Sequence, residues 1–508
     1  MLGKQSGQID VFNAMIFNRL VPKDHLLLKI DSIIDFSFVY EIVKNLYSPI
    51  GRDSKDPVMM VKILLLEYLY RLSDLSVVSR IRTDIAFRWF LSLSLDDEVP
   101  DDTTISHFRI HRLKEEHFEE FFNEIVRKCI EKDLVKTRRY ILDSTDVAAN
   151  VNYPSTKRLI CNGFRKVIKE IRRFDENLAD QELKKFEGDI DIEYDKDEKV
   201  SLSKHLEIAQ KHMEYLYLKT YDQLNESERY AKAYGILWDI INQYKSEGKD
   251  RIVSIVDPDA RVAHKSPGNI KRGYKDHIII DEDSEIILSS IQTPFNVGDE
   301  KELSPLIDKI QDNFEIKPAE VSADKVYGSI NNRAYLKDND ITGNISFYDE
   351  SNTEYEKFDL KKFYISEDLA IAKCPNGCIT AETKISKDGK DITYKFSVED
   401  CLNCPLREKC FTEADIKKGI IRRNVTVNRR YDAVLTDMKR NETQEFKDAI
   451  NKRYKVERRF ATLVRNHGLR RCRYLELPGA KIHITLANMA CNVVRMVNIL
   501  CHSKFVMS

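Results

Sequence analysis

The sequence has no surplus of either charge. Its 508 residues contain 82 Lys and Arg against 83 Asp and Glu, which gives a net charge of −1. This balance excludes a wholly basic nucleic-acid coat and a wholly acidic disordered tail, so any basic surface must be local. A charged fraction of 32% beside 42% hydrophobic residues is typical of a globular protein with highly charged helices.

Long apolar runs are also missing. No uninterrupted apolar stretch reaches the roughly 18–20 residues of a membrane span. The first residues, MLGKQSGQID, lack a basic segment followed by an apolar one. We therefore expect a cytoplasmic protein with no membrane partner. The sequence shows no repeat of fixed period and no low-complexity tract, and at this length we expect two to four domains.

Cysteine is too sparse for a disulfide scaffold, with ten in the whole chain. Five of them cluster with the spacing Cys374-x3-Cys378-x22-Cys401-x2-Cys404-x5-Cys410. Two close pairs about 20 residues apart are near the spacing of a zinc ribbon, in which four thiolates hold one ion. Five candidates compete for four positions, and a cluster of ordinary reduced thiols stays an alternative. The remaining cysteines are expected in the core: Cys129, Cys161, Cys472, Cys491 and Cys501.

The first 135 residues have a helical pattern. Apolar residues recur at helical spacing, most clearly in DPVMMVKILLLEYLYRL. This pattern predicts a helical N-terminal domain over residues 1–135. Near its end, Thr103 or Thr104 is expected to cap a helix whose basic residues form a solvated face. The apolar residues of that helix are Phe108, Ile110, Leu113, Phe118 and Phe121.

From residue 138 the pattern changes to strands. YILDSTDV and RIVSIVDPDARVAH each predict a strand, and KDHIIIDEDSEIILSSIQTP predicts a hairpin. A helix, DEKELSPLIDKIQDNF, and a short strand in PAEVSADKVYG follow. Residues 136–154 and 251–345 are therefore expected to form one α/β domain.

Two insertions and a helical end complete the predicted organisation. Residues 155–250 are highly charged, and we expect a helical hairpin there. Residues 346–430 contain the five clustered cysteines and are expected to be rich in strands. Residues 431–508 return to a helical pattern.

Three acidic residues stand out in this organisation. Asp143 and Asp324 each end a strand, and Glu457 lies in the basic helix NKRYKVERRFATLVRN. Alone, each fits an ordinary turn or cap residue, and only a fold could bring all three together. Converging carboxylates can hold two divalent cations about 3.5–4 Å apart, which stabilise both oxygens of an in-line phosphoryl displacement. Hard oxygen ligands suit Mg²⁺, with Mn²⁺ as a substitute.

The order of these motifs resembles the DDE transposases of bacterial insertion sequences over nearly the whole chain. VPKDHLLLKID, YSPIGRDSKDPVMMVKILLLEYLY and DDTTISHFRIHRL are similar to the helical N-terminal domain of that family. LDSTDVAANVN, VSADKVYGSINNRAYL and RYKVERRFATLVRNHGLRRCRY are similar to the segments that carry its two catalytic Asp and its catalytic Glu. The resemblance implies a ribonuclease H-like core in which Asp143, Asp324 and Glu457 are the catalytic metal ligands.

The resemblance also sorts the neighbouring acids. Asp146 falls where the family has no metal ligand, so we expect a polar turn residue. Asp257 and Asp259 fall where the family carries a similar acidic turn, and we expect a structural role for both.

The basic residues near Glu457 match the family in part. In related transposases a Tyr and an Arg precede the Glu, and a Lys follows it. Arg453 matches the Arg, whereas Ile450 and Val464 stand at the Tyr and Lys positions. The resemblance and the local charge imply these DNA-binding residues: Arg453, Arg458, Arg465, Arg109 and Arg112.

The function implied is that of an insertion-sequence transposase. Such a protein binds the ends of its element, cuts a strand by water attack, and uses the freed 3′-hydroxyl to attack target DNA. A homodimer on paired ends is implied as well. Two alternatives stay open: a non-catalytic DNA-binding regulator derived from a transposase, and a stand-alone metal-dependent nuclease.

Overall fold

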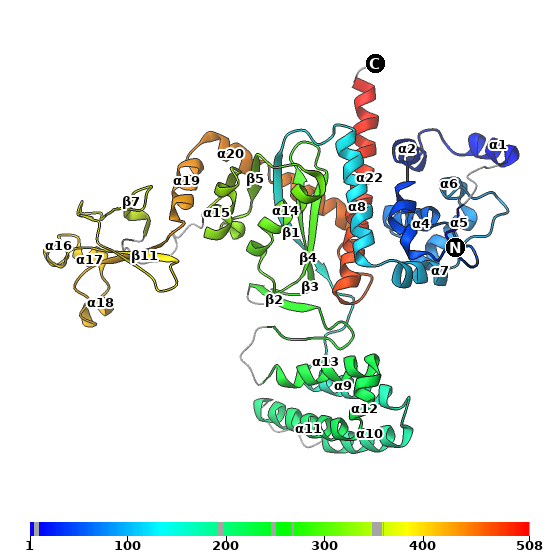
Figure 1. The fold of residues 1–508 in the computed structure, drawn as a ribbon, viewed down its shortest axis with the longest axis horizontal. Coiled ribbons are helices and arrows are strands. Elements are labelled where there is room, and N and C mark those ends of the chain that lie inside the picture. Colours follow the sequence, from blue (N-terminus) through cyan, green and yellow to red (C-terminus); the bar gives the residue numbers. More distant parts are fainter. Residues whose placement is uncertain are drawn as a thin grey trace.

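The computed structural model describes residues 1–4, 10–190, 198–244, 250–266, 269–347, 358 and 360–506. A mixed sheet with surrounding helices forms the centre of the molecule, and three extensions leave it (Figure 1). N-terminal helices lie on one side, a strand-rich lobe lies at the opposite end, and a helical lobe projects from one end of the sheet.

The central sheet combines antiparallel and parallel strands. Its strands are β1 (Arg139–Ala148), β2 (Arg261–Ser266), β3 (Asn269–Asp281), β4 (Ile287–Pro294), β5 (Glu320–Ala323) and β6 (Thr342–Ile345). The order is β2-β3-β1-β5-β6, and β4 pairs with β3. Strand β3 is antiparallel to β1, β2 and β4, whereas β1, β5 and β6 are parallel.

The strand predictions are confirmed for the hairpin and for the strand before Asp324, but RIVSIVDPDARVAH was placed too early. Strand β2 begins at Arg261, and residues 251–260 form a loop. The Ser254 hydroxyl accepts hydrogen bonds from the backbone N–H groups of Val256 and Asp257, both at 3.2 Å. Such local side-chain bonds favour a turn over a strand ladder.

Two helices, α14 (Leu303–Phe314) and the long C-terminal α22 (Glu476–Val506), pack on the sheet. Among the described helices, α22 is long and apolar enough to cross a membrane, yet 61% of its apolar window is buried inside the molecule. Its buried amides bind the sheet: Asn488 donates to Asp276, and Asn492 donates to the carbonyl of Ile287. These contacts identify α22 as a core helix.

The N-terminal helices share one continuous hydrophobic core with the sheet and α22, extending from Val21 to Val497. They are α1 (Val11–Leu20), α2 (Leu26–Ile33), α3 (Phe38–Val43), η1 (Lys44–Leu46), α4 (Pro57–Leu69), α5 (Asp74–Thr83), α6 (Ile85–Phe90), α7 (Asp102–His107), η2 (Phe108–Arg112) and α8 (Glu115–Glu131).

The helix predicted to start at Thr103 or Thr104 is wrong in two respects. Asp101 caps α7, because its carboxylate accepts from the N–H of Thr104 at 2.6 Å. The chain then passes through the π-helical turn η2 and is extended at Leu113, which is buried, before α8 begins. Burial of Leu113 in this break overrides the continuous helical pattern of the sequence.

The projecting lobe has a hydrophobic core of its own. It contains α9 (Thr156–Ile171), α10 (Glu176–Ile190), α11 (Glu198–Lys219), α12 (Tyr221–Glu226) and α13 (Glu228–Asn242). The predicted helical hairpin was therefore too small. Phe164 of α9 stacks on Phe186 of α10, with ring centroids 3.8 Å apart, so amphipathic faces of several helices close around one core.

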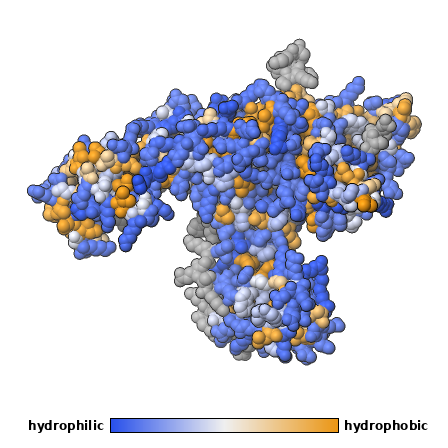
Figure 2. Space-filling view, in the orientation of Figure 1, coloured by the Kyte–Doolittle hydropathy of each residue, from blue (hydrophilic) through white to orange (hydrophobic). Residues whose placement is uncertain are grey.

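The strand-rich lobe contains the clustered cysteines. Its elements are η5 (Leu360–Lys362), β7 (Tyr364–Ile365), β8 (Ala372–Lys373), β9 (Ile379–Thr380), β10 (Thr383–Ile385), β11 (Asp391–Lys395), α16 (Val398–Leu402), α17 (Arg407–Cys410), α18 (Glu413–Lys417) and β12 (Asn424–Asn428). Apolar side chains gather on the visible face of this lobe (Figure 2). The exposed apolar residues of the lobe include Ile379, Leu402 and Ile416.

Further helices return the chain to the sheet. The 3₁₀ turn η3 (Asp299–Lys301) precedes α14, η4 (Lys325–Tyr327) and α15 (Ile330–Asp338) follow β5, and α19 (Tyr431–Asn441), α20 (Gln444–Asn451) and α21 (Tyr454–Asn466) lead into α22. Helix α21 contacts β1, so the chain returns from the strand-rich lobe to the strand that carries Asp143.

Gly273 enables the close pairing of β1 and β3. It faces Ala148 with φ +131°, and a Cβ there would lie 2.4 Å from the carbonyl oxygen of Val147. We expect Gly273→Ala to destabilise the fold by about 1–3 kcal/mol, measured as a lower urea midpoint. Gly235→Ala is the matched control, because Gly235 lies in a helix with no neighbour within 4 Å of the added Cβ, and helical Ala is favoured over Gly. Equal midpoints for the two variants would contradict this prediction.

Candidate active site

The two candidate aspartates lie side by side at one edge of the sheet. Strands β1 and β5 are parallel, and Leu142 pairs with Ala323. Asp143 and Asp324 are the next residues along each chain, so they lie at the same level. The sequence therefore predicted two residues that the fold does bring together. Asp324 directly follows β5, but β1 continues past Asp143 to Ala148, so the prediction that Asp143 ends a strand is wrong.

One guanidinium group joins these aspartates. Nη2 of Arg453 lies 3.0 Å from Oδ2 of Asp143, and Nη1 of Arg453 lies 3.6 Å from Oδ1 of Asp324. Arg453 stands at the N-terminal end of α21. Backbone N–H groups bind the aspartates as well: Ser144 donates to Asp143 at 2.8 Å, and Lys325 donates to Asp324 at 2.7 Å. The pair is thus held in a defined orientation.

Burial raises the pKa of Asp143, while the charge of Arg453 and the Ser144 hydrogen bond act in the opposite direction, and the nearby Asp324 adds to the increase. A partly buried carboxylate beside a second carboxylate is poorly solvated as an anion. A cation at this position relieves both penalties, and in this structure the Arg453 guanidinium is that cation.

Glu457 lies one helical turn after Arg453 on α21. Residues four apart share one face of a helix, so Glu457 and Arg453 extend from the same side of α21. The side chain of Glu457 is exposed, and within the described ranges it forms no hydrogen bond or ion pair. The fold thus brings Glu457 to the helix that contacts β1 but does not bring it into contact with the aspartates.

The donor set fits a hard divalent cation in its chemistry, because Asp143, Asp324 and Glu457 offer only carboxylate oxygens. Among the described residues, no group of three or more His, Cys, Asp or Glu side chains is close enough together to hold a metal ion. Two of the three expected ligands are therefore adjacent, and the third lies on the neighbouring helix.

A second polar cluster supports β1 and was missed from the sequence. The hydroxyl of Ser144 donates to Asp299 at 2.8 Å, and Lys275 donates to the same carboxylate at 2.5 Å. Tyr327 is buried beside it, and burial together with Asp299 and Asp143 raises the pKa of its phenol. The sequence predicted a helix that begins at Asp299, and an acidic residue is common at the start of a helix. Nothing in the sequence therefore marked Asp299 as part of a polar cluster.

The other acids near the sheet have structural contacts. Asp146 lies inside β1, paired with Lys275 in the β3 register, so the predicted turn is wrong. Asp257 is buried and accepts hydrogen bonds from the Tyr274 hydroxyl and from the N–H of Ala260. Asp259 accepts from the N–H of Leu477 at 2.8 Å.

The predicted DNA-binding arginines have different surroundings. Arg109 is buried and donates to both carboxylate oxygens of Asp74 at 3.1 and 2.7 Å, so its predicted place on a solvated face is wrong. Arg112 donates to the carbonyl of Leu46 at 3.0 Å, and Arg458 pairs with Glu285. Arg465 is exposed, with no side-chain partner in the part of the chain that the structure describes.

The five clustered cysteines line one small cavity in the strand-rich lobe. Cys374 and Cys378 close a tight turn, in which the N–H of Cys374 donates to the carbonyl of Cys378 at 2.9 Å and Gly377 has φ +91°. The sulfur atoms of Cys404 and Cys401 accept backbone hydrogen bonds from Leu406 and Arg423, both at 3.4 Å. Burial and the neighbouring Cys374 raise the pKa of Cys378.

All ten cysteines are free. Of those expected in the core, Cys129, Cys472 and Cys491 are buried, whereas Cys161 and Cys501 are half-buried.

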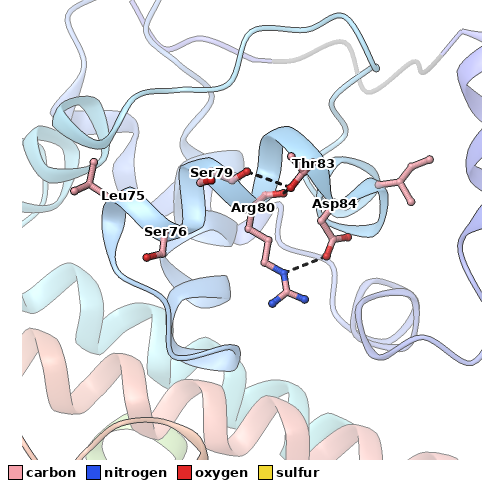
Figure 3. A pocket seen from close by; sticks show the side chains of 7 residues that line it. Leu75, Ser76, Ser79, Arg80, Thr83 and Asp84 are labelled. Atoms are coloured by element: carbon pink, nitrogen blue, oxygen red, sulfur yellow. Dashed lines mark hydrogen bonds and ion pairs between the residues drawn. The ribbon is translucent and has the colours of Figure 1, made fainter.

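A separate hollow of about 770 Å³ lies on α5, with Ser76, Ser79 and Arg80 in its lining (Figure 3). Nε of Arg80 pairs with Asp84 at 3.2 Å, and the hydroxyl of Thr83 donates to backbone carbonyls of its own helix. These contacts are local to the helix and its cap, and they bring no further acid, base or nucleophile into the hollow. It is therefore no rival to the aspartate pair as a catalytic site.

Comparison with known families agrees with these observations. Residues 15–111 match a family model described as a transposase domain (DUF772), and residues 373–497 match one described as a transposase DDE domain. The second match includes α21 with Glu457, while Asp143 and Asp324 precede it. No solved structure matches the chain.

Both matches are to models of transposases, proteins of DNA transposition and recombination, and each covers less than half of the chain. Together they support a DDE transposase of an insertion sequence. Transposases bind DNA, and DDE transposases generally use divalent metal ions such as Mg²⁺. The transposase match supports a protein that acts on DNA, and the apolar helix α22 is mostly buried inside the molecule.

Proposed function

We propose that this transposase cuts the ends of its own element and joins them to target DNA at a site formed by Asp143, Asp324 and Glu457. The observation that carries the proposal is the adjacent register of Asp143 and Asp324, held by Arg453 from the helix of Glu457. The strand order supports a ribonuclease H-like core, because three antiparallel strands continue into the parallel pair that presents the acids.

Divalent cations, Mg²⁺ or Mn²⁺, would supply Lewis-acid stabilisation of the attacking and leaving oxygens when bound. The chain itself positions the donors. Asp143, central and more buried, faces both Asp324 and the start of α21, so it is the residue suited to bridge. Asp324 and Glu457 would each supply a further carboxylate ligand to one of the cations. Arg453 orients both aspartates, and its guanidinium would be available to a phosphate once cations take its place at the carboxylates.

The reaction consists of two phosphoryl transfers. In the first, water attacks a phosphodiester at the element end, one P–O bond forms, and the bond to the departing 3′-oxygen breaks and leaves a 3′-hydroxyl. In the second, that hydroxyl attacks a target phosphodiester, so one bond again forms as another breaks. Each step forms one P–O bond and breaks one P–O bond at the same phosphorus. Because the nucleophile is water in the first step and the DNA 3′-hydroxyl in the second, neither step requires a covalent enzyme intermediate.

DNA affinity would come from basic residues near the site. Arg465 is the member of the predicted set that is exposed and unengaged within the described residues, and Arg453 already lies at the acids. Arg458 would have to exchange Glu285 for a phosphate. Arg109 is withdrawn from the set because it is buried. A homodimer on paired ends, acting in the cytoplasm, completes the proposal.

A plasmid assay tests this function. Supercoiled DNA that carries two matched element ends is incubated with the chain and Mg²⁺, and products are separated on a denaturing gel. We expect 3′-hydroxyl cuts at the ends and joined products, both lost when Mg²⁺ is chelated. Cuts without joined products would favour a stand-alone nuclease, whereas end binding without cuts would favour a non-catalytic regulator, and either result would reject the proposal.

We also propose that four of the five clustered cysteines hold a structural Zn²⁺. Their shared cavity and the two backbone N–H bonds to sulfur support this proposal. The described thiols are not close enough together to hold an ion as they stand, so zinc binding would have to draw four of them together. We expect about one zinc per chain, a structural site filled by four thiolates, measured by mass spectrometry of the purified protein. Cys401→Ser with Cys404→Ser is expected to remove the zinc and lower the melting temperature.

Cys161→Ser is the matched control for the zinc site, because Cys161 is half-buried but lies in the helical lobe. Its zinc content should equal that of the wild type. A wild-type chain purified with added zinc that contains none would support ordinary reduced thiols instead.

A further inference from the structure

An open groove of about 790 Å³ lies where the end of β1 meets the helical lobe. Its walls are residues 150–154 after β1, the start of α9, and residues 254–256. Arg158, Arg165 and Lys166 line it, together with the amides of Asn150, Asn152 and Asn162. No Asp or Glu is among its lining residues, so the groove carries one sign of charge although the whole chain is nearly neutral.

A second, smaller hollow of about 210 Å³ continues this groove, because Tyr153 lines both. Lys271, Arg272 and Arg470 contribute its basic side chains, and Asp146, its one acid, lies 3.6 Å from Lys271. Arg272 lies over the ring of Tyr153 at 4.8 Å. We call the two hollows together the basic groove.

Backbone contacts fix both ends of the basic groove. The N–H of Ala148 donates to the carbonyl of Arg470 at 3.0 Å, and the N–H of Cys472 donates to the carbonyl of Ala148 at 2.8 Å. The segment with Arg470 is therefore fastened beside the end of β1. On the other side, Lys166 of α9 donates to the carbonyl of Ile255 at 3.1 Å, which ties the helical lobe to the loop before β2.

Several charges in the basic groove are uncompensated. Arg158 and Arg470 are exposed, and neither forms an ion pair or hydrogen bond through its side chain with any described residue. Arg165 differs, because it pairs with Glu187 at 2.9 Å. On α9, Arg158, Asn162 and Arg165 recur at helical spacing, so they form one stripe along the groove.

We propose that the basic groove binds the sugar–phosphate backbone of the duplex beside the cleavage point. Guanidinium, amide and phenol groups are the usual partners of DNA phosphates, and such contacts position a duplex without reading its sequence. The proposal rests on the proposed function, since it places the groove on the same DNA that the aspartates cut. It also gives the helical lobe a role in DNA binding, because α9, close to the sheet in Figure 1, forms one wall of the DNA path.

The strand sets the spacing between groove and catalytic site. Asp143 and Ala148 are five residues apart on β1, which corresponds to about 17 Å at roughly 3.3 Å per residue. Duplex DNA rises about 3.4 Å per base pair. For a duplex that runs along β1, the contacts of the basic groove would begin about five base pairs from the scissile phosphate, on one side of it.

The test compares two charge-matched double variants in an Asp143→Asn background, so that binding is measured without cleavage. Arg158→Ala with Arg470→Ala removes the two uncompensated groove charges. Arg229→Ala with Arg19→Ala removes two exposed arginines outside the basic groove. Affinity for end DNA is measured by fluorescence anisotropy at several salt concentrations, and circular dichroism confirms that each variant is folded.

We expect the groove variant to weaken binding by about 10-fold or more and to lower the slope of log K against log salt by about 2, one unit per lost phosphate contact. The control should keep the wild-type slope. Hydroxyl-radical footprinting should show protection lost from about five base pairs beyond the cut. Equal slopes of log K against log salt for the two double variants would contradict the proposal that the basic groove binds DNA.

The result is separable from the proposed function. If the plasmid assay yields no cut DNA but the groove variant alone loses salt-dependent binding, the catalytic proposal fails and the basic groove stands. The opposite result is also possible: the groove variant binds and protects DNA like its parent, while protein with native Asp143 cuts and joins DNA. In that case the DNA-binding role of the basic groove is rejected and the catalytic proposal stands.

Discussion

Asp143→Asn is expected to abolish strand cleavage and joining, with a rate loss of about 10³-fold or more. The reason is that bridging two cations requires a charged carboxylate, and losing several kcal/mol of transition-state stabilisation corresponds to a factor of this size. Asn has the same shape and can still accept the hydrogen bond from the N–H of Ser144. The measurement is the initial rate of plasmid cutting in Mg²⁺.

The same variant is expected to keep or raise the stability of the fold. Burial raises the pKa of Asp143, which means that the folded protein holds this carboxylate at a cost. Neutral Asn removes that cost, and Arg453 keeps Asp324 as a partner. A urea midpoint at or above that of the wild type, together with lost cutting, would distinguish a catalytic carboxylate from a structural one.

Asp146→Asn is the matched control, because Asp146 lies three residues further along the same strand and has Lys271 within 3.6 Å. Because Asp146 also lines the basic groove, the comparison is made at saturating DNA, where cutting should stay near the wild-type rate. If Asp146→Asn lost as much activity as Asp143→Asn, the assignment of the metal bridge to Asp143 would be wrong.

The positions of the two aspartates could be predicted from local pattern. Each follows an apolar run, which is the local signal for a buried strand segment. The strand end was predicted correctly for Asp324 but not for Asp143, because β1 continues to Ala148. Their adjacency could not be predicted in this way, because it depends on the parallel pairing of Leu142 with Ala323 across 181 residues, which is 323 minus 142. Only the family resemblance linked them before the structure was known.

Charged residues on helices were harder to place. Arg109 and Arg453 both stand among other basic residues in the sequence, and that pattern is typical of a solvated face. Arg109 is instead buried against Asp74, and Arg453 joins two aspartates that are far apart in the sequence but lie on neighbouring strands. Sequence periodicity reports which side of a helix is apolar but not which carboxylate a guanidinium reaches.

The predicted boundaries of helices and strands were wrong where a side chain forms a hydrogen bond with the nearby backbone. Asp101 caps α7 ahead of the expected threonines, and Ser254 turns the chain where a strand was predicted. The helical lobe has more helices than the predicted hairpin. Each of its charged helices buries only a narrow apolar stripe, and these stripes form a core only when the helices pack together.

Arg109→Ala is expected to destabilise the fold by about 3–5 kcal/mol, the cost of leaving buried charges without their partner. The guanidinium binds Asp74 through two hydrogen bonds and lies 3.8 Å from the buried Glu67. It also lies over the ring of Tyr474, with its central carbon 4.5 Å from the ring centroid, so it links the N-terminal helices to the segment before α22. The measurement is urea unfolding followed by circular dichroism.

Arg112→Ala is the matched control, since Arg112 belongs to the same turn but donates to a single backbone carbonyl. Its expected cost is about 1 kcal/mol, a typical single hydrogen bond. If Arg109→Ala kept the wild-type urea midpoint and lost only DNA affinity, the buried ion pair would be the wrong account and the original DNA-binding prediction would be right.

The loss in Arg109→Ala should also depend on pH, because Glu67 shares the site. Burial raises the pKa of Glu67 to about 8 from its ordinary 4.5, although Arg109 lowers it. Between these values the folded chain holds a proton that the unfolded chain releases, so stability falls as pH rises from about 4.5 to about 8. Without Arg109 the folded pKa rises further, and the decline extends to higher pH. The variant should therefore lose more of its urea midpoint between pH 6 and pH 9 than the wild type, whereas a parallel decline would show that Arg109 does not act on Glu67.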